Sequence, residues 1–277
     1  MARIQSLDIL LDPTGKALLA EAYDGVIENV QKGTISGRIK NTDLSGDPNA
    51  GTVEAKRFAN SASKTYGTAR TAGAGDKLKE KPVTVAIDQN REFIEEIEQK
   101  DISLLGVDGL VAKRSANHAL RMEAELDEEF FKEGNTSGTK FTPSSGTTAI
   151  QDIVEEAIVT LETLKNDYID GVDRSMMSIT FDVATYSAMR KYLDTVQNTN
   201  VDTTTEEFIA FHGVPCYSSN RLPSGVKFEL MMDGSIAQPV RSTPYAAERI
   251  PMSEAMAIEM FFYYGTKAVT PETILVY

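Results

Sequence analysis

The stretch VTVAIDQNREFIEEIEQKD, residues 83 to 101, begins with the pattern of a β-strand. The apolar residues Val83, Val85 and Ile87 alternate with a threonine and an alanine. Because successive side chains of a strand point to opposite faces, this alternation predicts a strand with one apolar face. The second half of the stretch is crowded with carboxylates, and their role decides between several kinds of protein.

These carboxylates permit three interpretations: an acid–base pair, a cation site or the solvated face of a sheet. They are Glu92, Glu95, Glu96, Glu98 and Asp101. Three of them alternate with Phe93 and Ile97 as in a strand, although residues 94 and 95 interrupt the alternation. A catalytic pair needs an acid and a base in different environments. We therefore interpret most of these side chains as a solvated face and not as a catalytic site.

The overall composition narrows the class of protein. The chain has 277 residues, of which 41% are apolar, enough for one large or two ordinary domains. Its 41 acidic and 28 basic residues give a formal net charge of −13, which argues against a protein that wraps nucleic acid through a broad basic surface. With one cysteine and two histidines, neither an intrachain disulfide nor a Cys/His zinc site is expected.

The sequence predicts no targeting or membrane segment. The N-terminal residues MARIQSLDILLDPTGK do not form a signal peptide, because Asp8 and Asp12 interrupt their apolar patch. No apolar run approaches the roughly 20 residues that a membrane span needs. We therefore expect synthesis in the cytoplasm.

Charge is unevenly distributed along the chain. Residues 1–37 carry a net charge of −2, residues 38–121 a net of +2 and residues 122–277 a net of −13. Within the middle segment, residues 56–81 carry seven basic and two acidic side chains, a net of +5. We expect this segment to be the part of the chain that meets an acidic partner.

The first third of the chain predicts a helix and an extended hairpin. Residues 8–31 have apolar positions partly at helical spacing, and Pro13 and Gly15 break the start, so we expect a loose arm followed by a helix. The sequence TVEAKRFA, residues 52–59, predicts a strand. A long polar stretch separates it from the strand at Val83, and two strands around such a stretch predict an extended hairpin.

Two amphipathic helices follow. The first, at about residues 104–131, should have about six or seven turns and end at the loop of residues 133–146. Thr147 or Thr148 is expected to cap the second helix. The predicted core positions are Val107, Val111, Ser115, Ala119, Met122, Leu126 and Phe130 in the first helix, and Ile150, Ile153, Val154, Ala157, Ile158, Leu161 and Leu164 in the second.

The rest of the chain predicts a β-rich unit with flanking helices. Asp182 is a good N-cap for a helix at residues 183–194. The apolar C-terminal residues 255–277 are expected to return into a core. The fold class is therefore α+β. The predicted strands lie at residues 176–181, around 208–219 and at 227–234.

No sequence motif for catalysis or phosphate binding occurs. The absent patterns are G-x-x-x-x-G-K-[ST], G-x-G-x-x-G, H-E-x-x-H, G-x-S-x-G and the EF-hand loop. His118 and His212 have no Ser, Cys or carboxylate partner evident in the sequence, so we expect a structural role for each. Cys216 follows Pro215 in an apolar strand and is expected to be a small buried side chain. We predict no catalytic, cofactor-binding or metal-binding residue.

The order of these elements, together with short motifs, carries a resemblance to a known family. The motifs are GVP at residues 213–215 followed by RLP at 221–223, and YGTK at 264–267 followed by Pro271. From about residue 30 onward the chain resembles the major capsid proteins of tailed bacteriophages, which have the Hong Kong 97-type fold. The resemblance implies an N-terminal arm and helix at 1–50, an extended β-hairpin loop at 51–88, a peripheral domain with a spine helix at 89–146, an axial domain at 147–240, and a return to the peripheral domain at 241–277.

The resemblance implies a structural function with no enzymatic activity and no cofactor. A major capsid protein self-assembles into hexamers and pentamers of an icosahedral shell that encloses double-stranded DNA without sequence specificity. A portal protein would occupy one vertex, and the short segment before the loop implies a separate scaffolding protein. Assembly is expected in the host bacterial cytoplasm, with the virion capsid as the final location and no membrane involved.

The resemblance also implies where subunits touch one another. The extended loop would reach across a neighbouring subunit, so its basic side chains are expected to make inter-subunit contacts. They are Lys56, Arg57, Lys64, Arg70, Lys77, Lys79 and Lys81. Some members of the family crosslink a lysine to an asparagine, but nothing in this sequence indicates such a pair.

Three other functions remain open at this point. An encapsulin-type nanocompartment shell resembles the same fold and has a similar length. A tail-tube protein would be smaller and mostly β, which the two helices disfavour. A carboxylate-based hydrolase would use side chains of residues 92–101, which we interpret as a solvated face.

Overall fold

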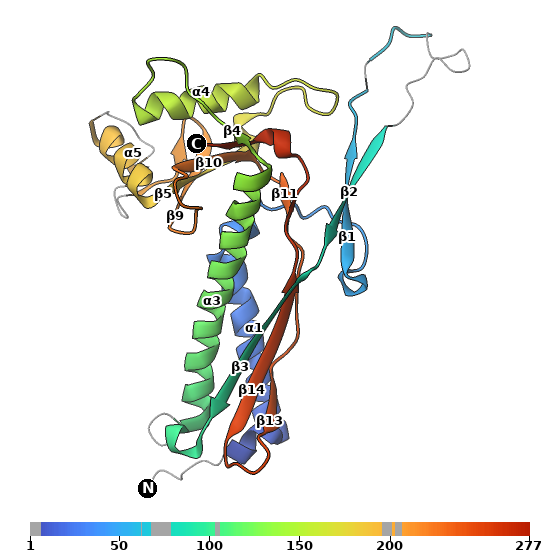
Figure 1. The fold of residues 1–277 in the computed structure, drawn as a ribbon, viewed down its shortest axis with the longest axis vertical. Coiled ribbons are helices and arrows are strands. Elements are labelled where there is room, and N and C mark those ends of the chain that lie inside the picture. The colour runs from blue at the N-terminus through green and yellow to red at the C-terminus, as the bar shows by residue number, and fades with distance from the viewer. Residues whose placement is uncertain (1–6, 62, 68–78, 103–105, 196–200, 203–206) are drawn as a thin grey trace. The chain divides into compact units, whose positions relative to one another are not determined.

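The computed structural model describes residues 7–61, 63–67, 79–102, 106–195, 201–202 and 207–277 (Figure 1). Its contacts divide the chain into two compact units, each with its own hydrophobic core. Unit 1 consists of residues 1–38, 87–129 and 239–265. Unit 2 consists of residues 39–86, 130–238 and 266–277.

Unit 1 contains a four-stranded antiparallel sheet in which β14, Met256–Tyr264, is the central strand. β3, Gln89–Ile97, pairs with β14 along its whole length. β13, Ala246–Arg249, and β12, Val240–Ser242, pair with β14 as well. Side chains of β14 alternate between buried and partly exposed, so one face of the sheet belongs to the core and the other faces outward.

The N-terminal helix begins earlier than its sequence predicts. A 3-10 turn, η1 (Leu7–Leu11), leads into α1, Pro13–Gly33, and both pack on the core of unit 1. The expected loose start is wrong, because Pro13 occupies the first turn, where a missing N–H costs no helical hydrogen bond. Gly15 is also required there, since a Cβ would lie 2.1 Å from the carbonyl oxygen of Ile9.

The long helix α3, Gly106–Ser137, has 32 residues and contributes to both units. All seven predicted core positions are buried, so the predicted apolar stripe is confirmed. The predicted end at residue 133 is wrong. The last turn persists because Gly134 packs against Glu229, where a Cβ would come within 2.5 Å of the carboxylate, and this packing overrides the low helix propensity of glycine.

Unit 2 contains a six-stranded sheet with the order β4-β16-β10-β5-β9-β8. The pairs β4–β16 and β5–β9 are parallel and the others antiparallel. Two helices, α4 (Ile150–Glu162) and α5 (Val183–Thr195), pack with the sheet around one core. The strands are β4 Thr139–Lys140, β5 Met177–Asp182, β8 Ala210–Phe211, β9 Val214–Ser219, β10 Phe228–Met232 and β16 Ile274–Val276.

The two predicted helix caps have different outcomes. Asp182 accepts a hydrogen bond from the backbone N–H of Thr185 at 2.9 Å, so its N-cap role on α5 is confirmed. The N-cap of α4 is Ala149, whose methyl group cannot accept a capping hydrogen bond, so the prediction for Thr147 or Thr148 is wrong. The Thr147 hydroxyl instead donates to Glu156.

The predicted hairpin is confirmed. β1, Thr52–Phe58, pairs antiparallel with β2, Glu80–Ala86, with Phe58 opposite Glu80. The stretch 83–101 therefore supplies the end of β2 in unit 2 and then β3 in unit 1.

The C-terminal residues divide between the two units. β14 belongs to unit 1, whereas β16 pairs with β10 and β4 in unit 2. The resemblance implied that residues 241–277 all return to one domain. The structure differs, because the last strand, β16, joins the sheet of unit 2. The remaining elements are α2 Ser36–Ile39, β6 Val201–Asp202, β7 Glu207–Phe208, β11 Ile236–Ala237, β15 Lys267–Ala268, and the 3-10 turns η2 Pro48–Ala50, η4 Gln99–Ile102, η5 Arg174–Met176 and η6 Pro271–Thr273.

Candidate functional site

Every second side chain at the base of the β1–β2 hairpin packs against other residues of unit 2. Val53, Ala55 and Val85 are buried in a small cluster with Ala237 and Val269. The intervening side chains of β1 are exposed. One face of the hairpin base is therefore core, and the other is open to a partner.

Arg57 lies on the buried face of the hairpin and is 8% exposed. Its guanidinium donates to the carbonyl oxygen of Val269 at 3.2 Å and forms an ion pair with Glu272. It also lies over the ring of Tyr168, 4.7 Å from the centroid. The contacts of Arg57 are thus made within its own chain. Arg57 follows Val53 and Ala55 at a spacing of two residues, so the strand alternation in the sequence already indicated that it is buried.

The other basic residues of the segment are placed differently. Lys56 is exposed and lies 3.6 Å from Glu80 across the hairpin. Lys64, Lys79 and Lys81 also have exposed side chains. Two aromatic residues near them are exposed as well: Phe58 by 50% and Tyr66 by 89%. Arg70 and Lys77 lie outside the described residues.

The carboxylates of β3 divide between its two faces. Glu92 and Glu96 are exposed, as the solvated-face interpretation predicts, and Glu98 beyond the strand is exposed too. The outward side of the sheet also carries residues of β14, because Ile94 is opposite Glu259 and Glu92 is opposite Phe261. We call this surface the acidic sheet face; it consists of Glu92, Ile94, Glu96, Glu259 and Phe261.

Glu95 departs from the solvated-face interpretation. It lies on the inward face of β3 and forms a two-pronged ion pair with Arg114 of α3, with Nε 2.6 Å from Oε2. The hydrogen bonds from Arg114 hold the pKa of this carboxyl below its usual value. Glu95 is therefore kept ionised, which suits a structural anion better than a proton donor.

His118 lies beside Glu95, contrary to the interpretation that it has no carboxylate partner. Its Nδ1 is 2.7 Å from the hydroxyl of Tyr245, and its Nε2 is 3.3 Å from Oε1 of Glu95 at an angle that makes no hydrogen bond. No local spacing in the sequence links these residues. The cavity between them is about 10 Å³, which leaves no room for a substrate.

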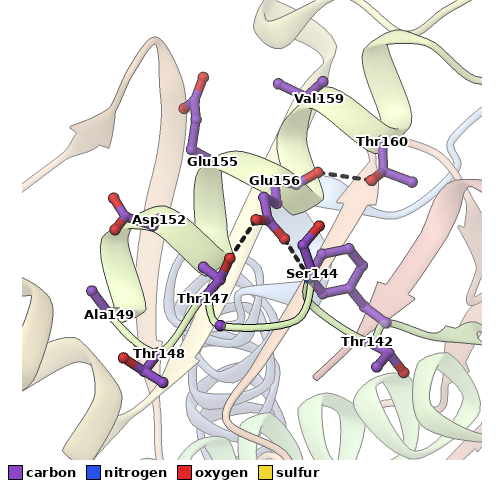
Figure 2. Close-up of a pocket in the computed structure, with 12 residues that line it drawn as sticks. Thr142, Ser144, Thr147, Thr148, Ala149, Asp152, Glu155, Glu156, Val159 and Thr160 are labelled. Carbon is purple, nitrogen blue, oxygen red and sulfur yellow. Dashed lines mark hydrogen bonds between the residues drawn. The ribbon is translucent and has the colours of Figure 1, made fainter.

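A hollow of about 690 Å³ opens at the N-terminal end of α4 (Figure 2). Glu156 fills part of it and accepts hydrogen bonds from the backbone N–H of Ser144 at 2.8 Å and the hydroxyl of Thr147 at 2.7 Å. These hydrogen bonds, the backbone one foremost, lower the pKa of Glu156. The described residues that line the hollow include no histidine, cysteine, lysine or arginine.

Arg174 joins α4 to the turn between β8 and β9. It pairs with Glu155 and Glu162, each at 2.7 Å, and donates to the carbonyl oxygen of His212 at 3.2 Å. His212 has a φ of +47° and places Nδ1 2.6 Å from Glu155. The expectation that His212 has no carboxylate partner is therefore wrong. The cluster fastens a strained turn to a helix.

The remaining groups to consider are the thiol of Cys216 and possible metal ligands. Cys216 is buried, as predicted, and burial raises the pKa of its thiol to about 12. Within the part of the chain that the structure describes, no group of three or more His, Cys, Asp or Glu side chains is placed to hold a metal ion. None of the described helices is both long and apolar enough to cross a bilayer.

Comparison with known proteins gives matches in structure only. No protein-family model matches the chain, and no curated protein sequence matches it. A chain of Mycobacterium phage Che8 matches with a TM-score of 0.57 and 18% identity, over 82% of this chain and 84% of that one. The capsid structure of the cyanophage P-SCSP1u matches with a TM-score of 0.59 and 11% identity, over 85% and 84%. A virus-like particle from Pyrococcus furiosus matches with a TM-score of 0.57 and 10% identity, over 92% and 97%.

These likenesses extend over most of each chain, and their low identities make them evidence of a shared fold. The α+β class expected from the sequence is confirmed.

Proposed function

Because the chain has the Hong Kong 97-type capsid fold, we propose that it is the major capsid protein of a tailed bacteriophage. The observation that carries the proposal is the coverage of the likeness: at least 82% of this chain and 84% of each structure described above. A shared core alone would leave the peripheral elements unmatched. The subunit then self-assembles into hexamers and pentamers of an icosahedral shell, and no catalytic step is assigned to it.

The proposed subunit contact joins the hairpin of one subunit to its neighbour. Lys56, Lys64, Lys79 and Lys81 have exposed side chains, and Phe58 and Tyr66 add apolar area. The acidic sheet face has matching chemistry, because it combines carboxylates with Ile94 and Phe261. Opposite charges across a contact steer association and set its register. We leave Arg57 out of this contact because it is held within its own chain, and Arg70 and Lys77 remain candidates by sequence.

The further partners follow from the proposed shell. Double-stranded DNA would be enclosed without sequence specificity, a portal protein would occupy one vertex, and a separate scaffolding protein would guide assembly in the host bacterial cytoplasm. The net charge of −13 supports enclosure over tight coating, because a shell that bound DNA through a broad surface would need an excess of cations there.

The test is the behaviour of the full chain produced in bacteria, alone and together with the products of its neighbouring genes. Sedimentation followed by negative-stain micrographs should show closed particles of uniform size. A chain that stays folded and monomeric in both preparations, at every protein and salt concentration, would refute the proposal.

A second candidate is an encapsulin-type shell. The observation that favours it is the match to the virus-like particle from Pyrococcus furiosus, which covers 97% of that chain. The contents of the particles discriminate the two functions. Nuclease-protected double-stranded DNA, with portal and terminase genes nearby, supports the phage capsid, whereas an enclosed enzyme encoded beside the shell gene supports the nanocompartment.

A further inference from the structure

We propose that His118 is a pH-sensitive latch in unit 1, which holds β3 against α3 while its imidazole is neutral and weakens that contact when the imidazole gains a proton. The latch concerns the packing of unit 1 alone and does not depend on the proposed shell function.

The imidazole ring of His118 contacts three segments of unit 1: its own helix α3, the strand β3 and the residue before β13. The residue lies on α3 and is 2% exposed. Its ring stacks on Phe93 of β3, with centroids 4.7 Å apart and planes 4° apart. Its Nδ1 lies 2.7 Å from the hydroxyl of Tyr245, just before β13. A change at this ring is therefore felt by the helix and by the sheet that packs on it.

The neutral imidazole fits this place and the charged one does not. Burial raises the pKa of Tyr245, so its hydroxyl keeps its proton, and we assign it as the donor to Nδ1. The ring hydrogen is then on Nε2, 3.3 Å from Oε1 of Glu95. Protonation adds a hydrogen to Nδ1, so the Tyr245 hydroxyl must turn from donor to acceptor, and the ring then carries a positive charge where it is only 2% exposed.

The charged groups around the ring do not compensate the added charge. Glu95 of β3 faces Nε2, but it already forms the ion pair with Arg114, which lies on the same helix as His118. The residues that α1 and β14 contribute here, Leu19 and Ile258, are apolar. The cavity of about 10 Å³ holds at most one water. Burial accordingly lowers the pKa of His118, and Glu95 offsets that effect only in part.

The sign of the pH effect follows from this direction. A folded-state pKa below the unfolded value of about 6.5 means that the unfolded chain takes up the proton first. The stability of unit 1 is complete above pH ~6.5 and falls as the pH decreases through the folded-state pKa. Glu229 and Asp233 have raised pKa values because they are buried, but they lie in unit 2 and their effect has the opposite sign.

Hydrogen exchange on the full chain, corrected for the intrinsic pH dependence of exchange, tests the latch. Between pH 7.5 and 5, β3 and the part of α3 in unit 1 should lose protection, and the midpoint of thermal unfolding should fall by about 2 °C or more. In His118→Gln this loss should disappear over the same pH range. Since the chain has only two histidines and His212 lies in unit 2, His212→Gln is the matched control and should keep the wild-type loss of protection in β3.

Two results would overturn the latch. One is protection of β3 in the wild type that does not change between pH 7.5 and 5, and the other is the same loss in His118→Gln as in the wild type. Should the substitution prevent folding, the imidazole resonance of His118 in the unmodified chain decides. A titration midpoint at or above ~6.5 contradicts the proposal, and a lower one supports it.

Discussion

Lys56 and Arg57 show how the pleat of a strand gives neighbouring cations different roles. Lys56 is on the exposed face of β1, with its ammonium 3.6 Å from Glu80. Arg57 is on the buried face, where Glu272, Tyr168 and a backbone carbonyl surround it. From composition alone, both residues would be assigned to one basic patch. The alternation of side chains along the strand shows that they lie on opposite faces.

Replacing Arg57 with alanine should destabilise unit 2 by about 2 kcal/mol, because Glu272 would lose its partner in a partly buried place. Lys56→Ala is the matched control and should change the stability by less than about 0.5 kcal/mol, since exposed pairs contribute little. Urea unfolding of the subunit measures both. Equal effects of the two substitutions would show that the contacts of Arg57 with Glu272 and Tyr168 do not stabilise unit 2.

Two helical glycines allow a second matched comparison. A Cβ on Gly134 of α3 would lie 2.5 Å from Oε2 of Glu229, so Gly134→Ala should destabilise by about 1–3 kcal/mol. A Cβ on Gly25 of α1 would meet nothing within 4 Å, so Gly25→Ala should stabilise by about 0.5–1 kcal/mol. Thermal unfolding gives both values. A stabilising Gly134→Ala would contradict the close packing of α3 on β10.

At the scale of elements, the interiors of helices and strands were predictable, whereas several of their ends were not. The apolar stripe of α3 and the hairpin follow from periodicity, which reports burial directly. Ends depend on contacts made elsewhere in the chain. Pro13 starts α1, and Gly134 extends α3 because it packs against a strand about a hundred residues away in sequence.

Helix caps test this distinction. Asp182→Ala should cost about 1 kcal/mol, because it removes the hydrogen bond to the N–H of Thr185 at the start of α5. Thr148→Ala should change the stability by less than about 0.5 kcal/mol, because the N-cap of α4 is Ala149 and makes no side-chain hydrogen bond. Denaturant midpoints compare the two directly. A larger loss of stability for Thr148→Ala than for Asp182→Ala would indicate that Thr148 caps α4, as the sequence predicts.

At the scale of the whole molecule, the sequence supported a fold through the order of its elements but could not place the side-chain clusters. Glu95, Arg114, His118 and Tyr245 meet only because β3, α3 and the C-terminal sheet pack together. No spacing rule spans such distances along a chain. The exposed cations of the hairpin, in contrast, were visible as a local charge excess.

The proposed hairpin contact predicts assembly that depends on charge and salt. Reversing Lys79 and Lys81 to Glu should leave the circular dichroism of the subunit unchanged and reduce the yield of particles in sedimentation. Assembly of the wild type should weaken as salt rises, because screening acts over about 10 Å at 0.1 M ionic strength and each exposed pair contributes only about 0–1 kcal/mol. The double reversal of Lys16 and Lys113, two exposed lysines of unit 1, is the control for net charge. Normal particles from the Lys79/Lys81 reversal at low salt would show that the charge of the hairpin contributes to solubility and not to assembly.

The most direct measurement is a cryo-electron microscopy reconstruction of particles formed by the full chain, at a resolution that traces each subunit. We predict closed icosahedral shells built of hexamers and pentamers, in which the exposed side of the hairpin at residues 51–88 of each subunit contacts a neighbouring subunit. Particles without such capsomers, or a well-ordered assembly in which the hairpin touches only its own chain, would contradict the proposed function and its proposed contact.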